Sequence, residues 1–208
     1  MSDKLTIKEK RDLVLQSGMQ LIPYVGGSMA SMYFGTKQEK RFKRLESFYQ
    51  ELAHDLQEMQ DSVRTIDTQN PIALEAIMES LHDKIELEPT LEKRQFFKNY
   101  FTSTLKQPIT DNYDERKYLL DSLGDMSLLE CEILAFIRSQ SQQVQVGAIS
   151  KPNVEQYAIV GIIGRLKSRG FLVAAQGSFS IGGADNSLQE LVAISEYGER
   201  FCSFCLSV

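Results

Sequence analysis

The residues best suited to chemistry in this sequence are two cysteines, Cys202 and Cys205. Their Cys-x-x-Cys spacing occurs in metal knuckles and in redox-active dithiols. A zinc site needs further ligands, however, and neither Cys131 nor either histidine lies near this pair in the sequence. Because Phe201 and Phe204 flank the cysteines in an apolar helical pattern, we interpret both thiols as buried side chains without a catalytic role.

Other catalytic patterns are missing from the sequence. Gly182-Gly183 lies in a polar stretch and is not followed by the Lys-Ser/Thr of a phosphate-binding loop. The two histidines, His54 and His82, are isolated from any cysteine and do not indicate a Cys-His nucleophile or a zinc hydrolase. Carboxylates such as Asp55 and Glu58 have the spacing of a solvated helix face. We therefore expect no enzymatic activity, no cofactor and no metal.

Composition and charge indicate a folded protein. The chain has 208 residues, of which 42% are hydrophobic and 25% charged, which suits one large or two small domains. The net charge of −5 disfavours a protein that coats nucleic acid non-specifically. Three sparse cysteines indicate a reducing compartment, and the first residues lack the pattern of a signal peptide, so we expect a cytoplasmic location.

The stretch 13–36 carries no charged residue, and small residues recur in it at Gly27, Ser31 and Gly35. One hypothesis is that it enters a bilayer, anchored by the basic residues that follow. The hypothesis we favour is a pair of short helices, broken around Pro23 and buried in protein. The basic run most simply forms a solvated face, with lipid or nucleic acid as alternative ligands; its members are Lys37, Lys40, Arg41, Lys43 and Arg44.

Residues 42–66 contain a regular heptad seam. Its apolar residues alternate at spacings of three and four: Phe42, Leu45, Tyr49, Leu52, Leu56, Met59, Val63 and Ile66. Such a seam must be covered by another helix. We favour an antiparallel hairpin with the apolar segment 71–85 of the same chain; the alternative is a coiled coil with a second copy, which would make a homodimer.

The rest of the N-terminal half is also predicted to be helical. Residues 90–106 form a helix that Thr90 can cap, and its aromatic face, which includes Phe97 and Tyr100, is expected in the core. The polar stretch from Gln107 to Asp114 predicts a domain boundary. The sequence therefore predicts a helical domain over 1–108 and a second domain over 109–208.

Residues 109–208 have the element order of a winged helix-turn-helix. A helix over 114–123 precedes a capping box, Ser127-x-x-Glu130, that begins a helix over 128–138. Residues 144–149 suit a strand or a short helix, and the helix over 152–169 ends at Gly170. Strand-like runs at 171–175 and 188–194 and a final helix from Ser195 complete the pattern. The predicted fold is thus mainly α, a helical hairpin or bundle followed by a winged helix with a small β-hairpin.

The helix over 152–169 offers contacts for DNA or for a partner protein. The candidate contact residues are Lys151, Asn153, Gln156, Arg165, Lys167 and Arg169. Residues 109–208 contain 8 basic and 12 acidic side chains, however, and the hairpin tip has no lysine or arginine. Because DNA binding needs favourable phosphate contacts around the helix, we favour a partner protein and keep DNA as the alternative.

Three runs resemble small bacterial proteins of the abortive-infection alpha type. They are residues 92–101, residues 128–134 and Ile194-Ser195-x-x-Gly198-x-x-Phe201. The resemblance covers residues 90–205 and implies a helical segment joined to a winged-helix-like end, a bacterial or mobile-element origin and a role in phage defence. It carries over no catalytic residue. The predicted function is a non-enzymatic interaction or regulatory protein; the alternative is an effector that inserts residues 13–36 into a membrane.

Overall fold

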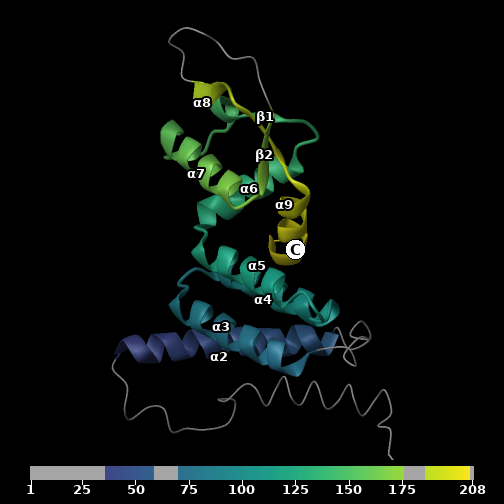
Figure 1. Cartoon of the computed structure of the whole chain (residues 1–208). Coiled ribbons are helices and arrows are strands. Elements are labelled where there is room, and N and C mark those ends of the chain that lie inside the picture. Colours follow the sequence, from purple (N-terminus) through teal and green to yellow (C-terminus); the bar gives the residue numbers. More distant parts are fainter. Residues whose placement is uncertain (1–35, 59–69, 176–185, 207–208) are drawn as a thin grey trace, which may run out of the picture. The chain divides into compact units, whose positions relative to one another are not determined.

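The computed structural model describes residues 36–58, 70–175 and 186–206 (Figure 1). This part of the chain is mainly helical with a small three-stranded antiparallel sheet, which confirms the predicted mainly-α class. The chain divides into two compact units, residues 1–124 and residues 125–208. The division falls at the last residue of the helix Tyr113–Asp125, later than the predicted boundary at residue 108.

The described part of the first unit consists of helices α2 (Thr36–Glu58), α3 (Pro71–Leu87), α4 (Leu91–Lys106) and α5 (Tyr113–Asp125). Asn70 caps α3, since its side-chain oxygen accepts hydrogen bonds from the N–H groups of Ile72 and Ala73. The aromatic face predicted on residues 90–106 lies in the core, where Phe97, Tyr100 and Phe101 are buried.

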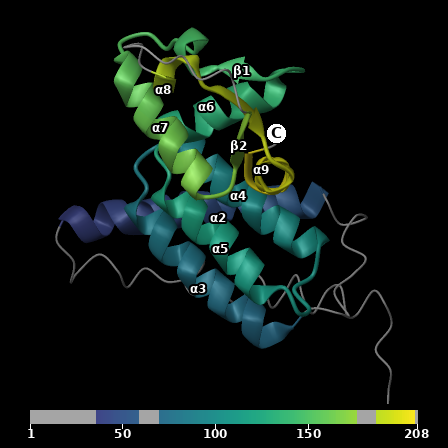
Figure 2. The same ribbon diagram turned by 45° about the horizontal axis from the view of Figure 1, so that its top comes forward.

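Helix α5 belongs to the first unit because polar contacts join it to α3 and α4. The hydroxyl of Tyr100 in α4 donates to the carbonyl of Arg116 in α5 at 2.9 Å. Lys84 in α3 forms an ion pair with Asp121 in α5 at 3.0 Å, where Figure 2 shows the two helices side by side. The sequence placed a boundary before α5 because its connecting turn is polar, whereas these long-range bonds keep α5 with the preceding helices.

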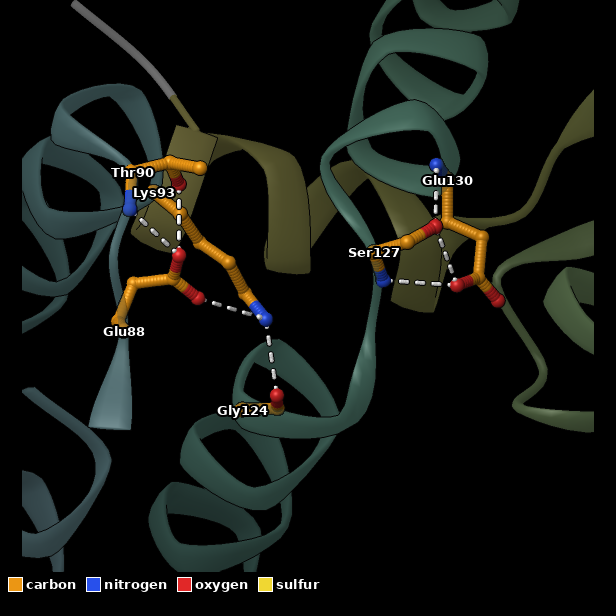
Figure 3. A network of polar contacts seen from close by, with 6 residues as sticks. All are labelled: Glu88, Thr90, Lys93, Gly124, Ser127 and Glu130. Atoms are coloured by element: carbon orange, nitrogen blue, oxygen red, sulfur yellow. Dashed lines mark hydrogen bonds and ion pairs between the residues drawn. The ribbon is translucent and has the colours of Figure 1, made fainter.

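A buried lysine strengthens the same packing. The Nζ of Lys93 donates to the carbonyl of Gly124, at the end of α5, over 2.8 Å and lies 3.4 Å from the carboxylate of Glu88 (Figure 3). Thr90 donates to that carboxylate through both its N–H and its hydroxyl. Thr90 therefore stands at the N-cap position of α4 without making the predicted side-chain cap, because its hydroxyl is bonded to Glu88.

The described part of the heptad seam is covered by the same chain. Leu45, Tyr49 and Leu52 are buried, and α2 packs against both α3 and α4. These three residues therefore pack against helices of their own chain and are not available for a coiled coil with a second copy. The side chains of Phe42 and Leu56, and residues Met59, Val63 and Ile66, lie outside the described residues.

The second unit combines short helices with the sheet. Its elements are α6 (Leu128–Ser139), β1 (Val144–Gln145), the 3₁₀ turn η3 (Val146–Ala148), α7 (Gln156–Ser168), β2 (Leu172–Ala175), α8 (Asn186–Gln189), β3 (Leu191–Ile194), α9 (Glu196–Phe201) and the π-helical turn η4 (Cys202–Leu206). The strand order is β1-β3-β2, with β3 antiparallel to both neighbours. The predicted hairpin is therefore present, and β1 adds a third strand.

The Ser195-x-x-Gly198-x-x-Phe201 pattern has a packing role in this unit. The Ser195 hydroxyl accepts from the N–H of Gly198 and so caps α9. A Cβ on Gly198 would lie 2.1 Å from the carbonyl oxygen of Phe171, so only glycine fits this close approach. Phe201 then stacks on Phe171 in the core with ring centroids 4.3 Å apart.

Three predicted element boundaries change. The helix predicted over 152–169 begins at Gln156, because Asn153 has a positive φ of 61° and Glu155 caps the first turn. Residues 144–149 contain both alternatives, a short strand and a single 3₁₀ turn. The strand predicted from residue 188 begins at Leu191, after the helical turn α8.

Candidate functional site

The candidate contact helix, α7, is fixed at both ends by local hydrogen bonds. The carboxylate of Glu155 accepts from the N–H of Ala158 and caps the N-terminus. At the C-terminus, Gly170 has a φ of 77°, its N–H donates to Lys167 and the N–H of Phe171 donates to Leu166. These two bonds form a Schellman motif, which confirms that Gly170 ends the helix.

The two faces of α7 differ in character. The inner face is aliphatic and buried; it consists of Ile159, Ile162, Ile163 and Leu166. The outer face is exposed and consists of Tyr157, Ala158, Gly161, Gly164, Arg165 and Ser168. Tyr157 is 54% exposed and is the one large aromatic residue on that face.

The basic residues at α7 are engaged by carboxylates of the same unit. Arg165 Nε donates to Glu130 Oε1 at 2.8 Å, and Lys151 Nζ donates to Glu132 at 3.1 Å. Lys167 is bonded to Glu190. All three of these cationic candidates for DNA contact therefore already have an anionic partner.

The polar candidates near the start of α7 are placed differently from each other. The side-chain amide of Gln156 donates to the carbonyl of Val146 at 3.1 Å, so it holds η3 against the helix. Asn153 is exposed and lies in the preceding turn, outside the helix. Arg169 is the half-buried C-cap residue. The structure thus places the six candidates around α7 without gathering them into one basic surface.

Glu130 has a central position because it joins two helices. Its carboxylate accepts from the N–H and hydroxyl of Ser127, which completes the predicted capping box, and from Arg165 at the far end of α7 (Figure 3 shows the capping box). Burial would raise the pKa of Glu130, but the hydrogen bonds from Arg165 and Ser127 outweigh it and hold this pKa below its ordinary value. Glu130 is therefore ionised at neutral pH and remains a strong acceptor.

The thiols are buried. Cys131, Cys202 and Cys205 form no disulfide bond and are buried, and burial raises the pKa of Cys202 to about 12. A thiol with that pKa stays protonated at neutral pH and is a poor nucleophile. In the part of the chain that the structure describes, no group of three His, Cys, Asp or Glu side chains is placed to hold a metal ion.

The basic run before the seam is not a single exposed surface. Lys40 and Lys43 are exposed on α2, whereas Arg41 and Arg44 are half-buried, and the side chain of Lys37 lies outside the described residues. The uncharged stretch 13–35 also lies outside them. Among the helices that are described, none has the length and apolar composition needed to cross a bilayer.

Comparison with known proteins gives no relative. No family model, no curated protein and no solved structure matches this chain.

The carboxylates that neutralise the basic residues are not among the contact residues predicted from the sequence. Glu130 could be recognised in the sequence as part of the capping box, whereas no sequence pattern singles out Glu132 or Glu190. Each ion pair joins residues that are far apart in sequence, as Arg165 and Glu130 are, and only the folded unit brings them together.

Proposed function

We propose that residues 125–206 act as a winged helix that binds a partner protein through the exposed face of α7. The element order supports the winged-helix interpretation: α6, β1, the short turn η3, α7, and then the antiparallel strands β2 and β3. In this arrangement α7 occupies the position of the recognition helix, and β2 and β3 form the wing.

We choose a protein ligand over DNA because the basic residues are neutralised within the unit. DNA binding draws most of its affinity from lysine and arginine contacts to phosphate. At α7, Lys151, Arg165 and Lys167 are bonded to carboxylates. Moving Arg165 to a phosphate would leave Glu130, whose side chain is 5% exposed, without its cation. A protein ligand requires no such exchange.

The helix before α7 also disfavours DNA. In a helix-turn-helix this element crosses the DNA backbone beside the recognition helix. Here the corresponding element is η3, a single turn of valine, glycine and alanine without a basic side chain. The exposed face of α7, in contrast, presents Tyr157 and Arg165, residue types that are enriched at the centres of protein interfaces.

Photo-crosslinking tests this assignment directly. A benzoylphenylalanine residue at position 157 is expected to cross-link to protein in cells, and the products are expected to resist nuclease. The matched control is the same residue at Phe136, an aromatic side chain of α6 that is 40% exposed. Nuclease-sensitive products at position 157, or equal protein products at both positions, would contradict the proposal.

A DNA gel shift gives an independent test. We expect the protein to show no salt-dependent shift, and the double variant Arg165→Glu/Lys167→Glu to behave like the parent. A shift that weakens with salt and is lost in the double variant would assign DNA as the ligand, because each phosphate contact released by salt lowers the affinity.

The biological role we propose is antiviral defence in a bacterial host, which follows from the resemblance to abortive-infection alpha proteins. Phage plating efficiency on cells with and without the gene is the relevant measurement. A drop that is lost in a Tyr157→Ala variant would connect defence to the α7 face. Equal plating across a panel of phages would separate the contact function from defence.

A further inference from the structure

The exposed face of α7 has charges of opposite sign at its two ends. Glu155 is exposed at the N-terminal end. Towards the C-terminal end lie the half-buried Arg169 and Arg165, whose Nε is bonded to Glu130 while its side chain stays 56% exposed. A helix with this pattern is complementary to an antiparallel copy of itself, since each acidic end then meets a basic end. The helix dipoles are also opposed favourably in that orientation.

We infer that the occupant of this face is a second copy of the chain, with the two α7 helices packed antiparallel about a two-fold axis at Gly161. This inference rests on the proposed function, because it names the partner that binds the α7 face. An isologous contact of this kind uses the same patch on both copies. It does not use the heptad seam, whose described residues are buried within the chain.

Helical geometry fixes the neighbours across such an axis. With 3.6 residues per turn, Tyr157 of one copy lies beside Gly164 of the other, next to Arg165. The missing side chain at Gly164 leaves room for the tyrosine ring, and the guanidinium comes within range of a cation–π contact. Glu155 of one copy lies between Arg165 and Arg169 of the other. The axis itself brings Gly161 against Gly161 and lets the backbones approach closely.

The glycines on this face have no evident role within the chain. Among the described atoms, a Cβ on Gly164 would meet nothing within 4 Å, and a Cβ on Gly161 would lie 3.9 Å from an Arg165 nitrogen, an ordinary contact. Glycine is a poorer helix former than alanine, so two of them in the middle of α7 weaken the isolated helix. Close approach of a second helix gives a reason for their presence.

The first test is the mass of the full chain in solution. Sedimentation equilibrium is expected to show a reversible dimer, and Gly161→Glu to raise its dissociation constant at least about tenfold by placing two carboxylates at the axis. Gly161→Glu keeps the helix intact, since glutamate is a better helix former than glycine and position 161 is exposed. The matched control is Ala135→Glu, an added carboxylate on the exposed face of α6.

The second test uses complementary charges. Glu155→Arg and Arg169→Glu are each expected to weaken the dimer when alone, and an equal mixture of the two variants is expected to form a heterodimer. In that mixture every acidic position faces a basic one, whereas residues 155 and 169 of a single chain are about 21 Å apart and cannot pair. Circular dichroism confirms that each variant is folded.

The outcomes separate the two proposals. A chain that stays monomeric at all concentrations, or a dimer that Gly161→Glu and the charge mixture leave unchanged, overturns the self-association. If position 157 then still cross-links to another protein, the proposed function stands with a different partner. Cross-links from position 157 to the Gly164–Arg165 segment of an isotope-labelled second copy support both the proposed function and the self-association.

Discussion

Arg165 donates from its Nε to Glu130 Oε1 at 2.8 Å and so joins the last turn of α7 to the first turn of α6. The same carboxylate caps α6 through Ser127. One acidic side chain thus fixes the position of the candidate contact helix and also removes from it the cation best placed for phosphate. The choice between a protein and a DNA ligand depends on this pair.

Replacing Glu130 with glutamine is expected to lower the free energy of unfolding by about 2 kcal/mol, because the cap is weakened and the charged hydrogen bond from Arg165 is lost. Urea unfolding measures the change. Glu132→Gln is the control: its pair with Lys151 is partly exposed, and its loss should cost under about 1 kcal/mol. Equal effects of the two substitutions would show that Glu130 has no special position.

Lys93→Met should destabilise the first unit by about 1–3 kcal/mol, since methionine keeps the aliphatic chain but leaves Glu88 without its cation and the Gly124 carbonyl without a donor. Lys117→Met removes an exposed pair with Asp121 within α5 and should change the stability by under about 0.5 kcal/mol. Chemical denaturation of the two variants side by side compares a buried lysine contact with an exposed one.

The first unit should lose stability in mild acid because of His82. Burial lowers the pKa of His82 below its ordinary value of 6.5, and it outweighs Glu86 and Asp83, which act in the opposite direction. The unfolded chain therefore takes up a proton at a higher pH than the folded chain. Stability is full above pH 6.5 and falls as the pH drops from there towards the folded pKa.

His82→Phe keeps the edge-on ring contact with Tyr49, whose centroid lies 5.1 Å away, and removes the titration. Its unfolding free energy should be flatter than that of the parent between neutral and mildly acidic pH. A parent chain whose stability is the same on both sides of pH 6.5 would contradict the assignment.

The three cysteines should resist alkylation while the protein is folded. All are buried, and the raised pKa of Cys202, about 12, keeps its thiol protonated. Iodoacetamide at neutral pH followed by intact-mass measurement should show an unmodified chain, with three additions after unfolding in urea. Rapid modification of Cys202 in the folded protein would restore the redox hypothesis for the Cys-x-x-Cys pair.

Two glycines of the second unit should respond to alanine in opposite directions. Gly164→Ala is expected to raise the unfolding free energy by about 0.5–1 kcal/mol at concentrations where the chain is monomeric, since open space surrounds the new methyl group among the described atoms. Gly198→Ala should destabilise strongly, because its Cβ would lie 2.1 Å from the Phe171 carbonyl oxygen. Thermal melts of both variants measure the contrast.

The sequence by itself determined the features that depend on near neighbours. The capping box at Ser127 and Glu130, the end of α7 at Gly170 and the antiparallel strands after it are set by local hydrogen bonds and backbone preferences, so they could be predicted. The mainly helical class followed in the same way from the apolar periodicity.

Only the tertiary structure decided which groups meet. Leu45, Tyr49 and Leu52 have a spacing that suits either a second copy or the same chain, and burial against α3 and α4 decides for the chain. From the sequence, the basic residues in and next to α7 are available to contact phosphate. In the folded unit, Glu130, Glu132 and Glu190 form ion pairs with Arg165, Lys151 and Lys167. The physical reason is that helical spacing fixes the face on which a side chain lies, whereas its charge partner comes from an element that is distant in sequence.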